Sequence, residues 1–141
     1  MCCLDKDYKK SLLEDRHAFL LADRLGFSEA YCGEHVTDAA ENITSSALFI
    51  ASIASCTKNI RLGTGTVNMP NSHPAAIAGQ IAMLDHMLDG RLNFGISPGG
   101  LASDAEVFGN LDKNRNEMFV GKDQQCFAFL HIKQEFKFAV Q

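Results

Sequence analysis

One histidine stands out as the residue whose type and position suit proton chemistry. His35 follows Glu34, and both come directly after the short stretch 27–32, which we predict to be a strand. Histidine is the side chain that exchanges protons most readily near neutral pH, and the carboxylate of Glu34 is a candidate for orienting its ring. A solvated loop histidine is the simpler alternative, and position alone does not decide between the two.

Two small-residue segments add candidate contacts for a ligand. Residues 63–66 read Gly-Thr-Gly-Thr at the end of a predicted strand, where a planar ligand or a phosphate can approach the backbone. The segment lacks the lysine of a P-loop and the spacing of a dinucleotide fingerprint, and a tight strand end that glycine permits is the alternative. Residues 97–100, Ser-Pro-Gly-Gly, offer backbone N–H groups that can bind anions. Ser103 and Asp104 are predicted to cap a following helix.

Metal and disulfide chemistry have little support. His35 and His73 lie in separate loops with no third ligand at a suitable spacing, so we predict no metal site. The five cysteines form no C-x-x-C pair. Reduced thiols are the expectation.

Alternating strands and helices must position these residues. The pattern predicts strands at 27–32, 60–68 and 91–96 and helices at 7–25, 44–56 and 75–88. Asn42 or Thr44 is expected to cap the second helix, and Gly26 to end the first. Ile77, Ile81, Leu84 and Leu88 recur at helical spacing in the third helix. This order predicts a parallel α/β sheet, in which ligands bind at the carboxyl ends of the strands.

The last part of the chain reads differently. We predict a division between residues 1–120 and an atypical tail at 121–141. In that tail Phe127, Phe129, Phe136 and Phe138 alternate as they would along a strand, although no neighbouring strand is predicted. Residues 97–116 are predicted to be irregular.

Composition and charge limit the kinds of binding partner and the cellular compartment that we expect. The 141 residues carry a formal net charge of −4, so a nucleic-acid partner is not expected. No apolar run reaches the roughly 20 residues that span a bilayer, and charged residues interrupt the N-terminal region where a signal peptide would lie. A cytoplasmic protein without a membrane partner is the expectation.

Taken together, these segments resemble the luciferase-like flavin monooxygenases, over about residues 23–117. The series in this chain is ADRLGF (22–27), GEH (33–35), TKNIRLGTGTVNMP (57–70), SHP (72–74), LDH (84–86), GR (90–91) and FGISPGG (94–100). Residues 98–109, PGGLASDAEVFG, look most like the branch of limonene and long-chain alkane monooxygenases. The ordered series is more specific than any one motif.

The resemblance implies part of a TIM (β/α)8 barrel that uses reduced FMN, supplied by a separate flavin reductase, and O2 to insert one oxygen atom into a small organic substrate. His35 matches the family's active-site histidine, and Gly65-Thr66 matches a place where many members have a non-proline cis peptide under the flavin ring. The other positions implied at the cofactor are Glu34, Ser97, Gly99 and Arg115. Val36 stands where many members have a second histidine, and Pro98 where bacterial luciferase has an arginine.

Length leaves several alternatives open. About three strands are predicted, whereas a TIM barrel has eight, so a truncated chain is the expectation. A deazaflavin-dependent oxidoreductase that transfers hydride is one alternative, and a non-catalytic flavin-binding remnant is another. Homo-oligomer formation stays open.

Overall fold

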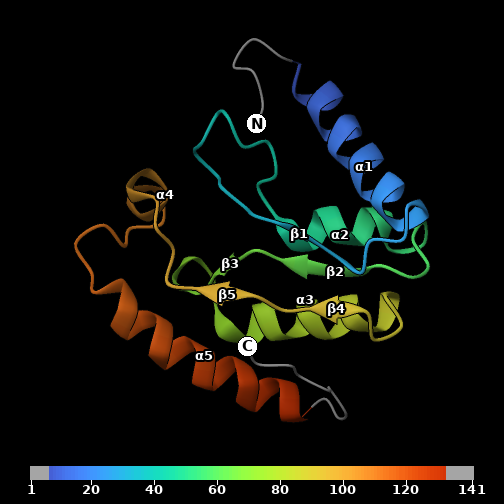
Figure 1. Cartoon of the computed structure of the whole chain (residues 1–141). Helices are drawn as coiled ribbons and strands as arrows, with labels where there is room; N and C mark the ends of the chain where they lie inside the picture. Colours follow the sequence, from blue (N-terminus) through green and yellow to red (C-terminus); the bar gives the residue numbers. More distant parts are fainter. Residues whose placement is uncertain (1–6, 133–141) are drawn as a thin grey trace.

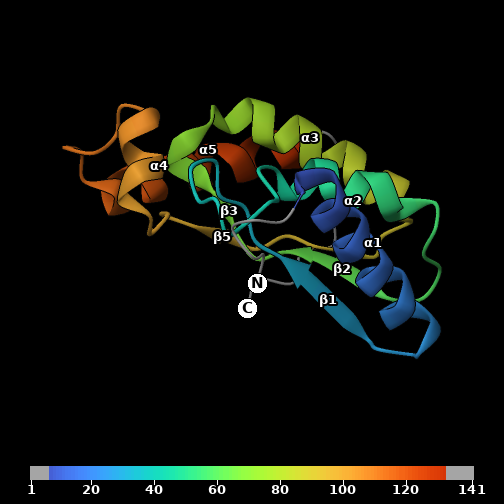
Figure 2. The ribbon, with the colours of Figure 1, turned by 90° about the horizontal axis from the view of Figure 1, so that it is seen from above.

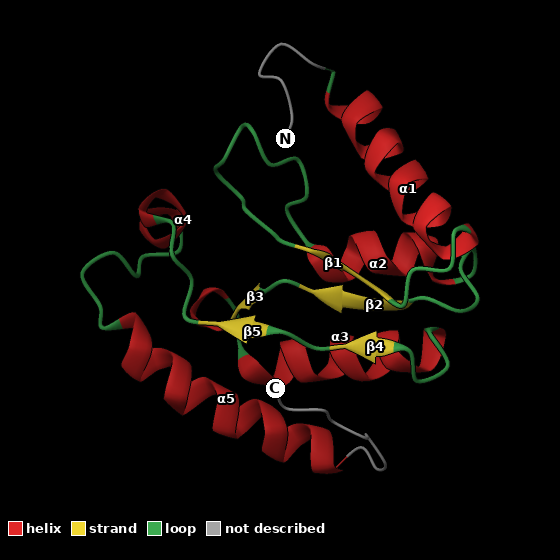
Figure 3. Cartoon of the chain, in the orientation of Figure 1, coloured by secondary structure: helices red, strands yellow, loops and turns green. Residues whose placement is uncertain are grey.

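The computed structural model describes residues 7–132, which form an α/β fold of short parallel strands and longer helices (Figures 1 and 3). The elements in chain order are α1 (Tyr8–Arg24), β1 (Glu29–Cys32), α2 (Ser46–Ala54), β2 (Arg61–Thr64), β3 (Val67–Asn68), the 3-10 turn η1 (Met69–Asn71), α3 (Pro74–Met87), β4 (Leu92–Asn93), β5 (Ile96–Ser97), α4 (Ala102–Val107) and α5 (Arg115–Ile132).

The strands are all parallel, as the sequence predicts. One sheet has the order β1-β2-β4, and β3 pairs with β5 in a second. The stretches 60–68 and 91–96 are each predicted to be one strand, and in the structure each of them forms two short strands. The interruption has a local cause, because the hydroxyl of Thr64 accepts from Gly95 N–H at 2.9 Å and donates to Gly95 C=O at 2.8 Å in place of ladder bonds. The peptide bond between Gly65 and Thr66 is cis at the same place.

Helices α1, α2, α3 and α5 lie along one side of the strands, and α4 lies beyond their carboxyl ends (Figure 2). A buried cluster between the sheet, α2 and α3 includes Ile50, Ile53, Ile60, Leu62, Leu84 and Leu88. A second cluster includes Met69, Ile77, Ile81, Cys126 and Leu130, and joins α3 to α5. The four residues predicted to line one face of the third helix are all buried, so that prediction is confirmed.

Two helix boundaries test the cap predictions. Gly26 follows the last turn of α1 with φ +80°, a conformation that glycine adopts without strain, as predicted. The predicted cap of α2 is wrong. Ser45 is its N-cap and accepts from Leu48 N–H at 3.3 Å, whereas Asn42 donates to Asp15 at 2.9 Å on α1.

The C-terminal region differs most from the prediction. Phe127 and Phe129 lie in helix α5 and not in a strand. Helical spacing explains this, because Phe119, Cys126, Phe127 and Leu130 all contact or belong to the cluster shared with α3. The predicted division at 120/121 falls within α5, and Phe136 and Phe138 lie outside the described residues. Residues 97–116, predicted to be irregular, include the short helix α4.

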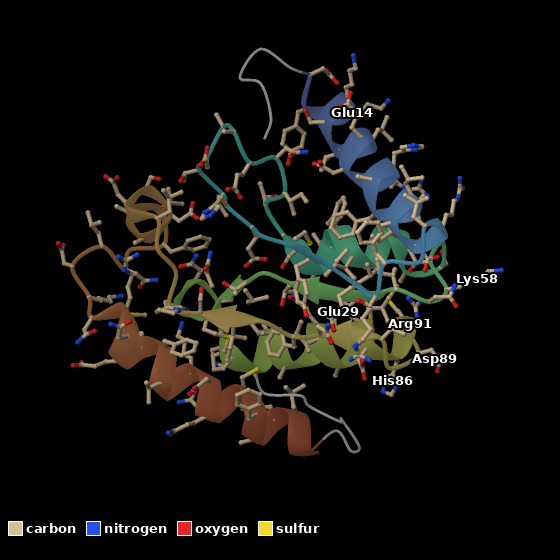
Figure 4. All side chains as sticks on the ribbon, viewed as in Figure 1. Glu14, Glu29, Lys58, His86, Asp89 and Arg91 are labelled. Atoms are coloured by element: carbon tan, nitrogen blue, oxygen red, sulfur yellow. The ribbon has the colours of Figure 1, made fainter. Side chains whose placement is uncertain are left out.

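The amino ends of the strands are tied together by charged side chains. The carboxylate of Asp23 accepts from the N–H groups of Lys58, Asn59 and Ile60 at 2.8–3.0 Å. Arg91 donates to Ile60 C=O at 2.7 Å and to Thr57 C=O at 3.1 Å. Figure 4 labels Lys58 and Arg91 at the end of the sheet opposite α4.

Over residues 7–132, no helix combines the length and apolar character needed to cross a membrane.

Candidate active site

The predicted site residues lie at the carboxyl ends of the strands, which is the end of the sheet nearest α4 (Figure 1). His35 follows β1, Thr66 precedes β3, and Ser97 is the last residue of β5. Parallel strands point the same way, so segments far apart in the sequence meet at this edge.

His35 is held by a residue that the sequence analysis assigned to a cap. Its Nδ1 lies 2.9 Å from Oδ2 of Asp104, which is 69 positions later in the chain. Asp104 lies inside α4, whose N-cap is Leu101 with no side-chain cap bond. Ser103 and Asp104 both lie inside α4, so the prediction that they cap a helix is wrong. The carboxylate that contacts the His35 ring is Asp104 and not the candidate Glu34. Local sequence gave no signal for the pair, because it depends on α4 folding back onto the loop after β1.

Asp104 is a fully paired, buried carboxylate, with 3% of its surface exposed. Its Oδ1 accepts from Val36 N–H at 3.1 Å, from Thr37 N–H at 2.9 Å and from the Thr37 hydroxyl at 2.7 Å. Burial by itself raises the pKa of the Asp104 carboxyl, but the hydrogen bonds from Thr37 and His35 outweigh burial and lower this pKa below its usual value. The carboxylate is thus ionised near neutral pH.

Glu34 ties three segments together. Its Oε2 accepts from Ser46 N–H at 3.0 Å and from the Ser46 hydroxyl at 2.7 Å, at the start of α2. Its Oε1 accepts from Asn68 N–H in β3 at 3.3 Å. These bonds hold the loop that carries His35 against α2 and β3.

A chain of hydrogen bonds continues from Glu34 to the residues beside the cis peptide. Asn68 donates to Glu34 C=O at 3.4 Å, and its Oδ1 accepts from the Ser97 hydroxyl at 3.0 Å. Ser97 accepts in turn from the Thr66 hydroxyl at 2.7 Å. Asn68 thereby links Glu34 to Ser97, although the sequence analysis did not assign it to the site.

The loop after β5 joins the same group. Gly99 has φ +76° and donates its N–H to the Ser97 hydroxyl at 3.2 Å. Arg115, at the start of α5, donates to Gly99 C=O at 3.0 Å. The structure therefore brings Gly65, Thr66, Ser97, Gly99 and Arg115 into one connected region, and the chain through Asn68 links that region to Glu34 and His35.

Two cavities flank the site. One of about 200 Å³ is lined by Glu34, Asn68, Asp104 and Phe108 among others, which is smaller than the roughly 300–1,000 Å³ of most ligand pockets. A larger cavity of about 690 Å³ lies between α1 and the loop after β1, with four carboxylate side chains in its lining: Glu14, Asp15, Asp38 and Glu41.

Metal binding gains no support. Within residues 7–132, no three His, Cys, Asp or Glu side chains lie close enough together to hold a metal ion. His73 instead accepts from Ala75 N–H at 3.2 Å as the N-cap of α3.

Comparisons with known proteins match most of the chain. The sequence model of one family, described as "Luciferase-like monooxygenase", matches residues 6–119. Limonene 1,2-monooxygenase of Rhodococcus erythropolis is 39% identical over 129 residues, which is 90% of this chain and 32% of that protein. The oxygenase component of the flavin-dependent trigonelline monooxygenase of Acinetobacter baylyi is 41% identical over 86 residues, 61% of this chain and 24% of that protein.

A solved structure agrees with the sequence matches. The oxygenating constituent of 3,6-diketocamphane monooxygenase of Pseudomonas putida, in complex with FMN, superposes with a TM-score of 0.83 at 27% identity, over 86% of this chain and 34% of that one. The α/β arrangement of this chain therefore matches part of the fold of that oxygenase. The chain spans between about a quarter and a third of the length of these relatives.

Proposed function

The chain belongs to the luciferase-like monooxygenase family, and we propose that it carries part of the active site of a flavin-dependent monooxygenase. In this proposal the whole protein uses reduced FMN and O2 to insert one oxygen atom into a small organic substrate. His35 is the residue that moves protons in the reaction.

The connected polar region at the carboxyl ends of the strands is the observation that carries the proposal. Residues 34–35, 65–66 and 97–99 come from three separate segments, and the hydrogen bonds through Asn68 and Ser97 hold them in one arrangement. Ligands bind at this end of parallel α/β sheets. A preorganised set of groups is what a cofactor site requires.

The residues present suit a flavin. The Gly99–Gly100 pair follows β5 and carries no side chain that would cover the backbone, and Gly100 is exposed, so a ligand can approach the chain closely there. We assign Glu34, Gly65, Thr66, Ser97 and Gly99 to contacts with FMN. Reduced FMN, when bound, supplies the electrons that activate O2.

Charge supports this location over the larger cavity. Arg115 is held beside Gly99 and contributes a positive charge suited to an anionic cofactor. Among the described residues, the lining of the 690 Å³ cavity has four carboxylates and no Lys or Arg, so it would repel the phosphate of FMN. The carboxylates beside the proposed site, Glu34 and Asp104, each accept at least three hydrogen bonds from the chain.

Relatives support the substrate class and the partner. The name of one relative specifies limonene, and another is called an oxygenase component. We therefore propose a small organic substrate and a separate flavin reductase as the source of reduced FMN. A cytoplasmic location and a homo-oligomer stay proposals of the same kind.

Oxygen consumption tests the function. Reduced FMN is supplied by a flavin reductase, and O2 uptake and hydrogen peroxide release are measured with and without the protein and with candidate substrates such as limonene. The proposal expects a protein-dependent product heavier by one oxygen atom.

The same experiment separates the alternatives. Reaction with a reduced deazaflavin but no oxygenation with reduced FMN would favour hydride transfer. FMN binding without turnover of any cofactor would favour the non-catalytic remnant.

A further inference from the structure

His35 has two ring nitrogens in different surroundings. Nδ1 lies 2.9 Å from Asp104. No residue among 7–132 forms a hydrogen bond with Nε2, and the Glu41 carboxylate lies 3.9 Å from it. With 25% of its side chain exposed, His35 is open to solvent on one side.

We propose that Asp104 is a positioning residue that keeps the proton of neutral His35 on Nδ1, so that Nε2 is the atom that accepts and returns protons in the reaction. The role in the reaction rests on the proposed function. The tautomer itself is a property of the chain.

The pairing of Asp104 decides the tautomer. An ionised carboxylate can only accept hydrogen bonds, so Nδ1 must donate at this contact. The other oxygen, Oδ1, accepts from the N–H groups of Val36 and Thr37 and from the Thr37 hydroxyl. A charge-assisted bond of this kind favours one tautomer by about 10-fold or more.

Neighbouring carboxylates do not compete for Nδ1. The Glu34 side chain is bonded to Ser46 and Asn68. Glu41, 52% exposed, lies on the Nε2 side. A proton taken up at Nε2 can therefore pass toward Glu41 and water, while Nδ1 stays protonated throughout.

Asparagine at position 104 should reverse the tautomer. Two backbone N–H groups point at the Oδ1 position, so the amide oxygen of Asp104→Asn will occupy it. The amide NH2 then faces His35 and donates to Nδ1, which forces the proton onto Nε2. The same substitution in a serine protease triad also leaves the wrong tautomer.

Nitrogen NMR of the ¹⁵N-histidine-labelled chain tests this without any flavin. The His35 signals, assigned by their loss in His35→Gln, should show a protonated Nδ1 and an unprotonated Nε2 in the neutral ring. Asp104→Asn should invert the pattern. Thr37→Val, which removes one hydroxyl from the same carboxylate, and Glu106→Gln, on the exposed side of α4, should both leave it unchanged.

Two outcomes would overturn the proposal: a wild-type ring protonated on Nε2, or an Asp104→Asn ring that keeps the wild-type pattern while its amide spectrum shows a folded chain. If Asp104→Asn does not fold, the spectra of the wild type and of Thr37→Val still test the proposal, because the neutral His35 ring must be protonated on Nδ1 in both. Failure of FMN to bind would count against the proposed function alone.

Discussion

At the scale of single residues, the site depends on which carboxylate reaches His35. The adjacent Glu34 bonds to Ser46 and Asn68, and the distant Asp104 bonds to the ring. Sequence adjacency suggested the first and the fold supplies the second. His35 is thus the residue whose replacement should affect the proposed chemistry most.

Replacing His35 by Gln should lower turnover of the protein by about 10²–10⁴-fold, because general acid–base catalysis contributes that much. Product formation with reductase-supplied FMN measures it. A Glu106→Gln variant, which changes an exposed side chain of α4 outside the hydrogen-bonded region, serves as the control and should stay close to wild type. Unchanged turnover in His35→Gln would remove this histidine from the mechanism.

The buried thiols should be unreactive in the folded chain. Burial raises the pKa of Cys32 to about 12 and that of Cys126 to about 11, so both stay protonated at pH 8 and are poor nucleophiles. Alkylation followed by mass spectrometry should label exposed Cys56 and leave these two until urea is added. Native labelling of Cys126 at the rate of Cys56 would contradict the packing of α5 on α3.

At the scale of elements, most of the sequence predictions succeed where one pattern dominates. Helices α1, α2 and α3 and the parallel order of the strands follow from hydrophobic periodicity and turn residues. The failures depend on contacts between distant segments. Strands 60–68 and 91–96 divide because Thr64 bonds to Gly95, and α5 is helical because it can pack on α3.

The same distinction holds within the site. Gly65, Thr66 and Ser97 could be proposed as site residues because their sequence motifs resemble those of a family. Asp104 and Asn68 could not, because each acts through a side-chain contact made only after the chain folds.

Two glycine substitutions should change the stability of the folded chain in opposite directions. A Cβ at Gly95 would collide with the carbonyl of Thr64, whereas one at Gly79, in α3, would meet nothing within 4 Å. Urea unfolding should show Gly95→Ala lowering the free energy of unfolding by about 1–3 kcal/mol and Gly79→Ala raising it by about 0.5–1 kcal/mol. Equal effects of the two would contradict the close approach of β2 to the β4–β5 connection.

Asp23 should stabilise the amino ends of the strands in a pH-dependent way. Burial raises the pKa of its carboxyl, but the three backbone N–H bonds outweigh this and lower the pKa. A lowered folded pKa gives stability that is fully present above the unfolded value of about 3.9 and is lost as pH falls through the folded value. Asp23→Ala should therefore cost about 1–3 kcal/mol at pH 7, and this difference should shrink below about pH 4.

The control for Asp23 is Asp112→Ala, an exposed carboxylate in the loop before α5. Urea unfolding at several pH values should show little change for this variant. A loss in Asp23→Ala that stays constant down to pH 3 would indicate that packing, and not the carboxylate, is responsible.

At the scale of the whole molecule, we propose that FMN binds at the carboxyl ends of the strands, at the end of the sheet nearest α4. The opposite end carries Lys58 and Arg91 (Figure 4), and there Asp23 and Arg91 form hydrogen bonds that stabilise the fold. The family match covers both ends, so membership alone does not locate the site.

Backbone amide NMR during an FMN titration tests this claim most directly. Binding at this end of the sheet should change the chemical shifts of residues 34–35, 65–66 and 97–100 and leave residues 58–60 and 89–91 unchanged as an internal control. Changes confined to the amino ends of the strands, or none at millimolar FMN, would contradict it.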